Sequence, residues 1–299
     1  QYVYQKYKLY DEKFLNNEFE IPYHFLNPRI GINYNISSSW HSYLSISNTT
    51  REPRLKNFYD AAEASTPESW GPVVPQFEMS SDSVYNFNKP LVQPETLTGI
   101  ELGLGYQSAV FKGNVNLYSM SFRNEIIKKG GVDRFGQPIT GNAENTLHQG
   151  VEAAGQLQVL PQISLSGNIT YSHNELVSYT VFDSDTSIML DGNRIAGFPD
   201  LLGNLRLTYN WQGTYASLDL RYSGKYYTDN FENEKNTVDA YTVFNLSLRQ
   251  DLSLIGLQEA AIQLKINNLL DKKYLAHGEG AAFFPAATRN WFVNLQYKL

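Results

Sequence analysis

Residues with the chemistry to bind a ligand are concentrated in one long connection, residues 51–93. Its candidate ligand-binding residues are two arginines and four of its aromatic residues, namely Arg51, Arg54, Tyr59, Trp70, Phe77 and Tyr85. A guanidinium group binds anions through paired hydrogen bonds and stacks on rings, and an aromatic face stacks on a flat ligand. The segment therefore predicts a site for an aromatic or anionic ligand. The alternative interpretation is that both arginines pair with carboxylates of the protein itself.

A second candidate segment lies near the C-terminus, LAHGEGAAFFPAAT, residues 275–288. It offers one imidazole and two phenyl rings, from His277, Phe283 and Phe284. Its Gly and Ala residues leave the backbone adaptable, so we expect a loop that adjusts to a ligand. The alternative is a simple mobile connection with no binding role.

Motifs for catalysis and for metals are incomplete. The chain has no Cys, which excludes thiolate metal sites, disulfides and a Cys nucleophile. The string ELGLGYQ lies in a predicted strand and lacks the third glycine and the helix that bind phosphate. Asp183 and Asp185 resemble the start of a calcium loop, but Ile188 stands where glycine is needed. The five His show no paired spacing on one strand face. We therefore predict no catalytic residue, no metal and no cofactor, and hence no enzyme.

The elements that position these segments follow from an alternating pattern. In RNWFVNLQYKL, residues 289–299, apolar Trp291, Val293, Leu295, Tyr297 and Leu299 alternate with mostly polar residues. Successive side chains of a strand point to opposite faces, so this strand has one apolar and one polar face. The pattern recurs in about eleven strands of roughly ten residues, the length that a tilted membrane strand needs.

Both faces can be assigned along the chain. The apolar face is expected to include Ile30, Ile32, Tyr34, Leu44, Leu102, Leu117, Val151, Leu205, Leu220, Leu246 and Ile266. The polar face is expected to include Glu101, Glu152, Arg206, Asp219, Arg221, Arg249 and Lys265. A further strand over residues 2–10 has a poorer pattern.

The connections alternate in length. Short ones fall at 37–39, 107–110, 160–162, 211–213 and 252–258, and long ones at 51–93, 124–145, 175–199, 228–238 and 269–288. A soluble sandwich has no reason to sort its loops in this way, whereas an outer-membrane barrel has short periplasmic turns and long extracellular loops. We therefore predict an all-β, antiparallel transmembrane barrel whose C-terminus is periplasmic. Tyr34, Trp40, Tyr106 and Trp211 lie beside the short turns, as interfacial aromatics do.

Composition excludes other classes. Charged residues make up 18% of the 299 residues, and the formal net charge is −6, which argues against a nucleic-acid partner. No stretch approaches the roughly 18 consecutive apolar residues of a membrane-spanning helix.

Several stretches together resemble the C-terminal end of TonB-dependent outer-membrane receptors. The most specific is KINNLLDKKY, residues 265–274, followed by Pro285 and the strand at 289–299. NPRIGINYNI, TTREPRL, PETLTGIELGLGY, HQGVEAAGQ and GNRIAGFP agree in the expected order. One departure is Leu299, which stands where the family usually ends on Phe.

The resemblance implies half of a barrel of about twenty-two strands, with residues 1–299 as its C-terminal part. It implies a plug domain and the remaining barrel strands outside this chain, TonB as a partner reached through an N-terminal segment, and a bacterial outer-membrane location. Arg51 and Arg54 match the Arg-containing end of an inward-facing strand of the family.

The resemblance also implies a function, which is active import of a small extracellular ligand. A ferric siderophore or similar metal chelate is the ligand class that we expect. Cobalamin, haem or an oligosaccharide are alternative ligands, and a passive porin is an alternative function. A soluble β-sandwich or adhesin is the alternative that lacks a membrane.

Overall fold

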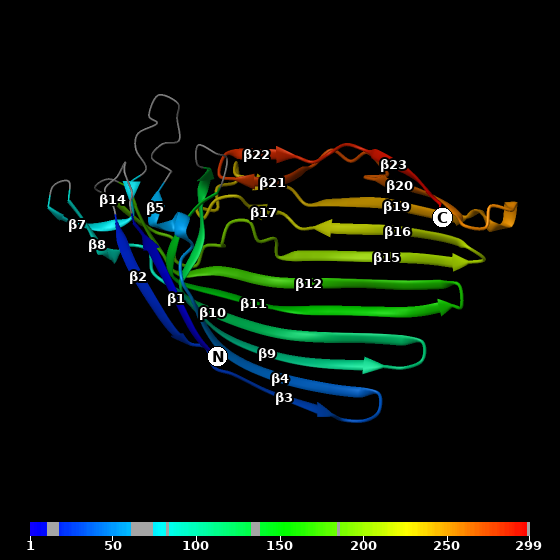
Figure 1. Cartoon of the computed structure of the whole chain (residues 1–299), viewed down its shortest axis with the longest axis horizontal. Coiled ribbons are helices and arrows are strands. Elements are labelled where there is room, and N and C mark those ends of the chain that lie inside the picture. Colours follow the sequence, from blue (N-terminus) through cyan, green and yellow to red (C-terminus); the bar gives the residue numbers. More distant parts are fainter. Residues whose placement is uncertain (11–17, 61–73, 82–83, 133–137, 184–185, 298–299) are drawn as a thin grey trace.

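One antiparallel sheet of eleven strands dominates the computed structural model of the chain (Figure 1). The structure describes residues 1–10, 18–60, 74–81, 84–132, 138–183 and 186–297. Each strand of the sheet pairs with the next one along the chain. The strands are β3 (Arg29–Asn35), β4 (Trp40–Arg51), β9 (Glu95–Gln107), β10 (Phe111–Val132), β11 (Pro138–Leu160), β12 (Ile163–Ser178), β15 (Leu201–Trp211), β16 (Thr214–Ser223), β19 (Tyr241–Asp251), β20 (Ala260–Asn267) and β23 (Asn290–Tyr297).

Cross-strand pairing aligns the apolar residues of neighbouring strands into rows. One row consists of Ile32, Leu44, Leu102, Leu117, Val151 and Tyr171. A second consists of Leu207, Leu218, Leu246, Ile266 and Trp291. These side chains are not covered by another layer, since Leu102 is 50% exposed and Trp291 is 68% exposed. Apolar area on this scale is unfavourable in water, so this face fits a hydrocarbon environment.

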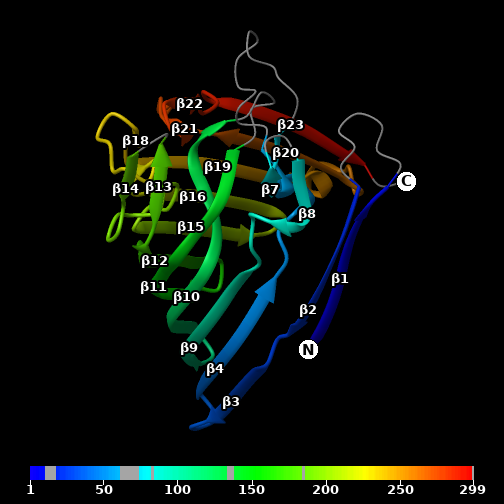
Figure 2. The ribbon, with the colours of Figure 1, turned by 90° about the vertical axis from the view of Figure 1, so that its left-hand side faces the viewer.

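The opposite face of the sheet carries polar rows. Lys112, Gln156, Ser166, Arg206, Asp219 and Asn245 face one another across six strands. Figure 2 shows that the sheet curls into an open arc rather than lying flat. Polar residues of β10 to β20 line a hollow of about 770 Å³. The predicted fold class and the predicted division of faces are both confirmed.

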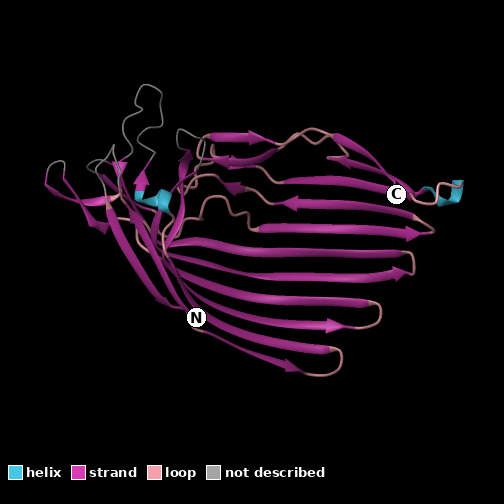
Figure 3. Cartoon of the chain, in the orientation of Figure 1, coloured by secondary structure: helices cyan, strands magenta, loops and turns pink. Residues whose placement is uncertain are grey.

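The two ends of the sheet differ in their connections, as the sequence predicted. At one end, which we call the turn end, the segments 36–39, 108–110, 161–162 and 212–213 join neighbouring strands. Gln212 and Gly213 both have left-handed backbone angles, with φ of 46° and 75°, which suits a two-residue hairpin turn. Aromatic residues gather here, and the rings of Trp40 and Tyr106 lie 4.7 Å apart. The other end, which we call the loop end, carries the long connections (Figure 3).

Smaller hairpins cover the loop end. They are β1–β2 (Tyr2–Leu9, Phe19–Leu26), β5–β6 (Tyr59–Asp60, Val74–Pro75), β7–β8 (Phe77–Ser81, Val84–Pro90), β13–β14 (Thr180–Asp183, Thr186–Met189), β17–β18 (Tyr226–Tyr227, Thr237–Val238) and β21–β22 (Leu275–Glu279, Ala282–Pro285). Buried apolar clusters lie among these hairpins and the loop-end parts of the long strands. Helical structure among the described residues is limited to the short 3-10 segments η1 (Leu55–Phe58) and η4 (Leu252–Ile255), and no helix there is long and apolar enough to cross a membrane.

One expected loop is wrong. Residues 124–145 were predicted as a long connection, but β10 continues to Val132 and β11 begins at Pro138. The two strands stay paired well past the apolar rows because main-chain hydrogen bonding does not depend on the side-chain pattern. The poorly patterned segment at residues 2–10 does form a strand, β1, but it pairs with β2 rather than with the large sheet.

Candidate ligand-binding site

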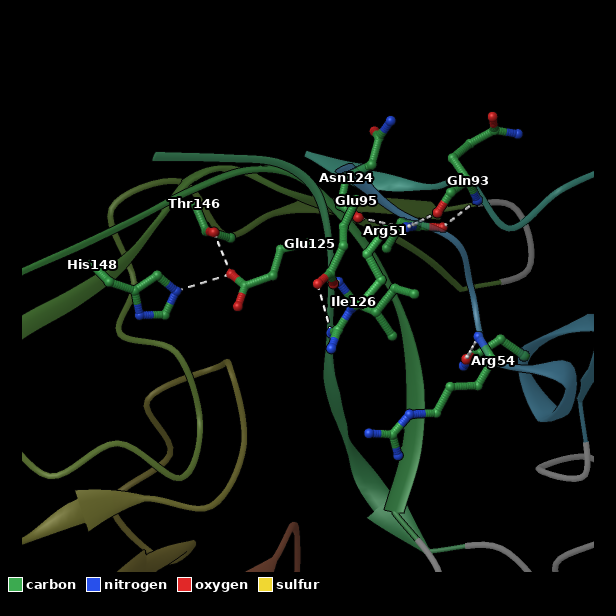
Figure 4. Close-up of polar contacts among 11 residues, drawn as sticks. Arg51, Arg54, Gln93, Glu95, Asn124, Glu125, Ile126, Thr146 and His148 are labelled. Carbon is green, nitrogen blue, oxygen red and sulfur yellow. Dashed lines mark hydrogen bonds and ion pairs between the residues drawn. The ribbon is translucent and has the colours of Figure 1, made fainter. Parts of the chain in front are cut away.

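Arg51 ends β4 at the loop end of the sheet. Its Nη2 lies 2.6 Å from Oε1 of Glu95, the residue directly opposite on β9. Glu95 is buried, and its Oε2 accepts a hydrogen bond of 3.0 Å from the backbone N–H of Ile126 (Figure 4). The Arg51 side chain is still 58% exposed. Its guanidinium thus has one internal partner and an accessible face.

Arg54 lies three residues further on, before η1. Its backbone N–H donates to Oδ1 of Asn57, but its exposed guanidinium forms no ion pair with another described residue. Tyr59 stands opposite Pro75 in the β5–β6 pair. Trp70 lies outside the described residues. Of the sequence-predicted arginines, Arg54 is therefore the one that has no ion-pair partner among the described residues.

Phe77 and Tyr85 lie in an aromatic core that joins β1–β2 to β7–β8. Phe77 is 2% exposed, and its ring centroid lies 5.3 Å from that of Phe19 and 5.1 Å from that of Phe87. Tyr85 is partly buried against the same cluster. In this arrangement Phe77 meets other rings rather than solvent. The structure therefore places Phe77 in the packing of this connection and not on a surface that a ligand could reach.

His277, Phe283 and Phe284 come together in the β21–β22 hairpin. Nε2 of His277 lies 2.6 Å from Oε1 of Glu279, and its ring stacks on Phe284 at 5.9 Å between centroids. Phe284 is 43% exposed. Phe283 instead packs against the cluster of Tyr226, Val238 and Tyr241. Two of the three predicted side chains therefore remain accessible to a ligand.

A buried polar network on β10, β11 and β12 was not predicted from the sequence. Oε2 of Glu125 lies 3.0 Å from Nε2 of His148 and also accepts the hydroxyl of Thr146 (Figure 4). Nδ1 of His148 lies 2.8 Å from Oδ1 of Asn174. Asn124 has a left-handed backbone (φ 54°) directly before Glu125. Asn adopts a left-handed backbone more readily than most residues, so Asn124 is a weak sequence signal of an irregular strand at this point.

The same network sets the charge of His148. The imidazole lies beyond the apolar band, because the lipid-facing positions of β11 end at Val151 and Gln149 is the next residue on that side. Burial lowers the pKa of His148, but the hydrogen bond and charge of Glu125 and the hydrogen bond with Asn174 raise it, and the net pKa lies above the ordinary value. Two acceptor oxygens facing the two ring nitrogens favour the imidazolium form.

A cleft of about 310 Å³ at the loop end was also not predicted. It is lined by Lys129, Asn142, Tyr179, Thr180, Val181, Phe182, Asn230 and Phe231. Asn142 links the cleft to the Arg51 region, because its Oδ1 accepts from the backbone N–H of Gln93 and its Nδ2 donates to the carbonyl of Asn124. No group of three or more His, Asp or Glu suited to a metal ion occurs within the described ranges.

Comparison with known proteins gives one family. Residues 2–269 match the family described as TonB dependent receptor-like, beta-barrel. The chain is 28% identical over 195 residues to the ferrioxamine receptor of Yersinia enterocolitica, which covers 62% of this chain and 25% of that protein. It is 27% identical over 131 residues to the ferrichrome outer membrane transporter/phage receptor of Escherichia coli (strain K12), covering 43% of this chain and 16% of that protein.

Solved structures agree in fold. The copper transporter OprC superposes with a TM-score of 0.68 at 15% identity, over 94% of this chain and 41% of that one. The chain therefore spans a quarter or less of the length of these two curated relatives, and under half of the solved structure.

Proposed function

Because the chain belongs to the TonB-dependent receptor-like β-barrel family, we propose that it forms the C-terminal half of an outer-membrane receptor that imports an extracellular ligand with energy relayed by TonB. The observation that carries this proposal is the division of the sheet into an exposed apolar face and a polar face lining a hollow. In such a receptor the apolar face meets lipid, and the polar face meets the plug domain and the path of the ligand.

The orientation follows from the connections. Short turns are periplasmic and long loops extracellular in barrels of this type, so the loop end would meet the medium and the C-terminus the periplasm. Arg51, Arg54, His277 and Phe284 would then stand at the ligand entrance. Plug, TonB contact and the remaining strands would be supplied by polypeptide beyond residues 1–299.

The ligand class that this end of the molecule favours is a metal chelate, most simply a ferric siderophore. Accessible guanidinium groups and exposed rings suit a large, partly anionic or aromatic chelate. The ferrioxamine and ferrichrome proteins among its relatives are consistent with this choice. The relatives and solved structures that the chain resembles are named as receptors and transporters, which supports a transporter rather than an enzyme.

Uptake of radiolabelled iron(III) as a trihydroxamate chelate, by cells whose only such receptor is this one, tests the function. We expect uptake that depends on TonB and stops when a protonophore collapses the inner-membrane gradient. Chelate entry that continues without TonB would instead support a passive porin. Competition by cobalamin, haem or an oligosaccharide would reassign the ligand without changing the mechanism.

A further inference from the structure

Two adjacent lysines at the tip of the β10–β11 hairpin have different surroundings. Lys128 forms an ion pair with Glu279 of β21, which is 2% exposed. Lys129 is exposed, lines the 310 Å³ cleft, and forms no ion pair with another described residue. The nearby carboxylate of Asp229 is already engaged, because it accepts from the N–H groups of Phe231 and Asn233 and from Nδ2 of Asn236. Among the side chains that the structure describes, Lys129 is thus a cation of the cleft with no carboxylate partner.

The backbone holds the stem of Lys129 in place. Gly141 lies on β11 beside it, and a Cβ atom added at Gly141 would stand 2.2 Å from Cε of Lys129. The lysine stem therefore lies across the bare backbone of Gly141. A side chain at Gly141 would displace this stem and the ammonium group that it carries.

Exposed rings form other parts of the cleft wall. Phe182 at the end of β13 is 77% exposed, and Phe231 in the connection between β17 and β18 is 44% exposed. Large apolar rings held in water on separate segments that share one cleft are typical of a recognition site. The floor is ordered, since Tyr179 is 5% exposed and Asn230 is 1% exposed.

Asn230 ties the cleft to two other segments, β10 and the connection between β14 and β15. Its Nδ2 donates to the carbonyl of Lys128 at 2.7 Å, and its Oδ1 accepts the N–H of Ala196 at 2.9 Å. Its carbonyl accepts from Nδ2 of Asn193 at 2.9 Å. Asn230 itself directly precedes Phe231, and it bonds the carbonyl of Lys128, the residue before Lys129. It therefore links the backbone at the two positions that carry the ring and the cation.

The β21–β22 hairpin braces this junction from the other side. Gly280 donates its N–H to the carbonyl of Thr228 and accepts the Thr228 hydroxyl on its own carbonyl. It has φ of 55°, and a Cβ atom there would stand 1.9 Å from the carbonyl oxygen of Gly130. Only a glycine allows the two hairpins to approach this closely.

We propose that this cleft is a recognition site for an anionic group on a flat, unsaturated part of the ligand, with Lys129 as its cation, Phe182 and Phe231 as its walls, and Asn230 as the residue that positions them. The proposal rests on the proposed function, which it deepens by naming the charge and shape of the ligand group. An ammonium group and aromatic faces together select flat anions over neutral groups of the same shape.

Fluorine NMR on the complete receptor in detergent tests this without requiring transport. The probes are para-fluorobenzoate and its uncharged counterpart para-fluorobenzamide. We expect the receptor to broaden the benzoate signal more than the benzamide signal, and Lys129→Gln to weaken benzoate binding about tenfold, the loss of one charge-assisted contact. Equal broadening of both probes by the unsubstituted receptor, or unchanged benzoate binding in Lys129→Gln, would overturn the proposal.

Matched variants separate recognition from folding. Phe231→Ala should weaken both probes, and Lys235→Gln, an exposed lysine of the same connection, should weaken neither. Asn230→Ala should weaken benzoate binding and speed amide exchange at Ala196, whose N–H loses its acceptor, whereas Asn233→Ala should leave both unchanged. Gly141→Ala, which pushes the lysine stem aside, gives an independent check if Asn230→Ala fails to assemble.

Loss of iron uptake with intact benzoate selectivity would count against the proposed function and not against this cleft.

Discussion

Replacing Arg51 and replacing Arg54 should have different effects, because Arg51 pairs with the buried carboxylate of Glu95. Arg54→Ala removes a cation that forms no ion pair with another described residue, so we expect ligand affinity to fall about tenfold, with no change in the stability of the receptor. Arg51→Ala also strips Glu95 of its ion pair, and an unsatisfied buried group costs about 1–3 kcal/mol. Chelate uptake and thermal unfolding of purified receptor would separate the two effects. Unchanged uptake in both variants would remove the arginines from the site.

His148 predicts a pH dependence of the loop end. Its pKa is raised in the folded chain, so its stabilising charge is fully present below the ordinary value of about 6.5 and is lost as pH rises through the higher folded value. We expect amide exchange at Glu125 and Asn174 to quicken on that rise, beyond the intrinsic effect of hydroxide. His148→Gln should abolish the extra step, and a step that persists in this variant would exclude His148 as its source.

Residue roles were predictable only where a side chain acts alone. The exposed guanidinium of Arg54 follows from its place in a polar connection. The burial of Phe77 does not, because its neighbours Phe19 and Phe58 come from segments distant in sequence. The network of Glu125 and His148 likewise depends on the register of β10 against β11, which no local pattern specifies.

At the scale of elements, the strands were predictable because lipid and water impose a period of two on each one. The register rows of the structure match the apolar positions read from the sequence, from Ile32 on β3 to Trp291 on β23. The extension of β10 and β11 beyond residue 124 was not predictable in this way. Past the apolar band, Ile127 of β10 and Ala143 of β11 are buried in a cluster at the loop end. Burial there replaces the alternation between lipid and water, so the alternating pattern no longer indicates a strand.

Adjacent residues of β15 give a direct test of the two faces. Leu205 stands opposite Leu220 on the apolar face, and Nδ2 of Asn204 donates to Oδ1 of Asn168 on the polar face. We expect Leu205→Arg to destabilise the membrane-inserted receptor by about 2–4 kcal/mol, the cost of a cation at mid-depth in lipid. Asn204→Arg should cost far less, because it points into water or toward the plug. Urea unfolding from lipid vesicles measures both, and equal costs would contradict the assignment of the faces.

At the scale of the whole molecule, closure of the sheet depends on its two edge strands, β3 and β23. Within the described residues, β3 pairs only with β4 and β23 only with β20, so each has an outer edge of unpaired backbone groups. In hydrocarbon each such group costs several kcal/mol. Either the eleven strands close on themselves or further strands complete the barrel.

The direction of the strands decides between these. Each strand of the sheet runs antiparallel to the next, so β3 and β23, the first and the eleventh, both run toward the turn end. Closure of β23 on β3 would create one parallel pair in an otherwise antiparallel barrel, and bacterial barrels of a single chain have even strand numbers. An odd number of additional strands removes the conflict, as the remainder of a barrel of about twenty-two strands would.

Disulfide trapping in the complete receptor tests this directly, and residues 1–299 contain no native Cys that would compete. Leu264 and Val293 are register partners on β20 and β23, so cysteines at these two positions should cross-link on oxidation. Cysteines at Ile32 and Val293, on the two edges, should not, because other strands would lie between them. Efficient cross-linking of the second pair would mean that the eleven strands close alone. The half-barrel assignment would then be wrong, although the division of the sheet between lipid and water would stand.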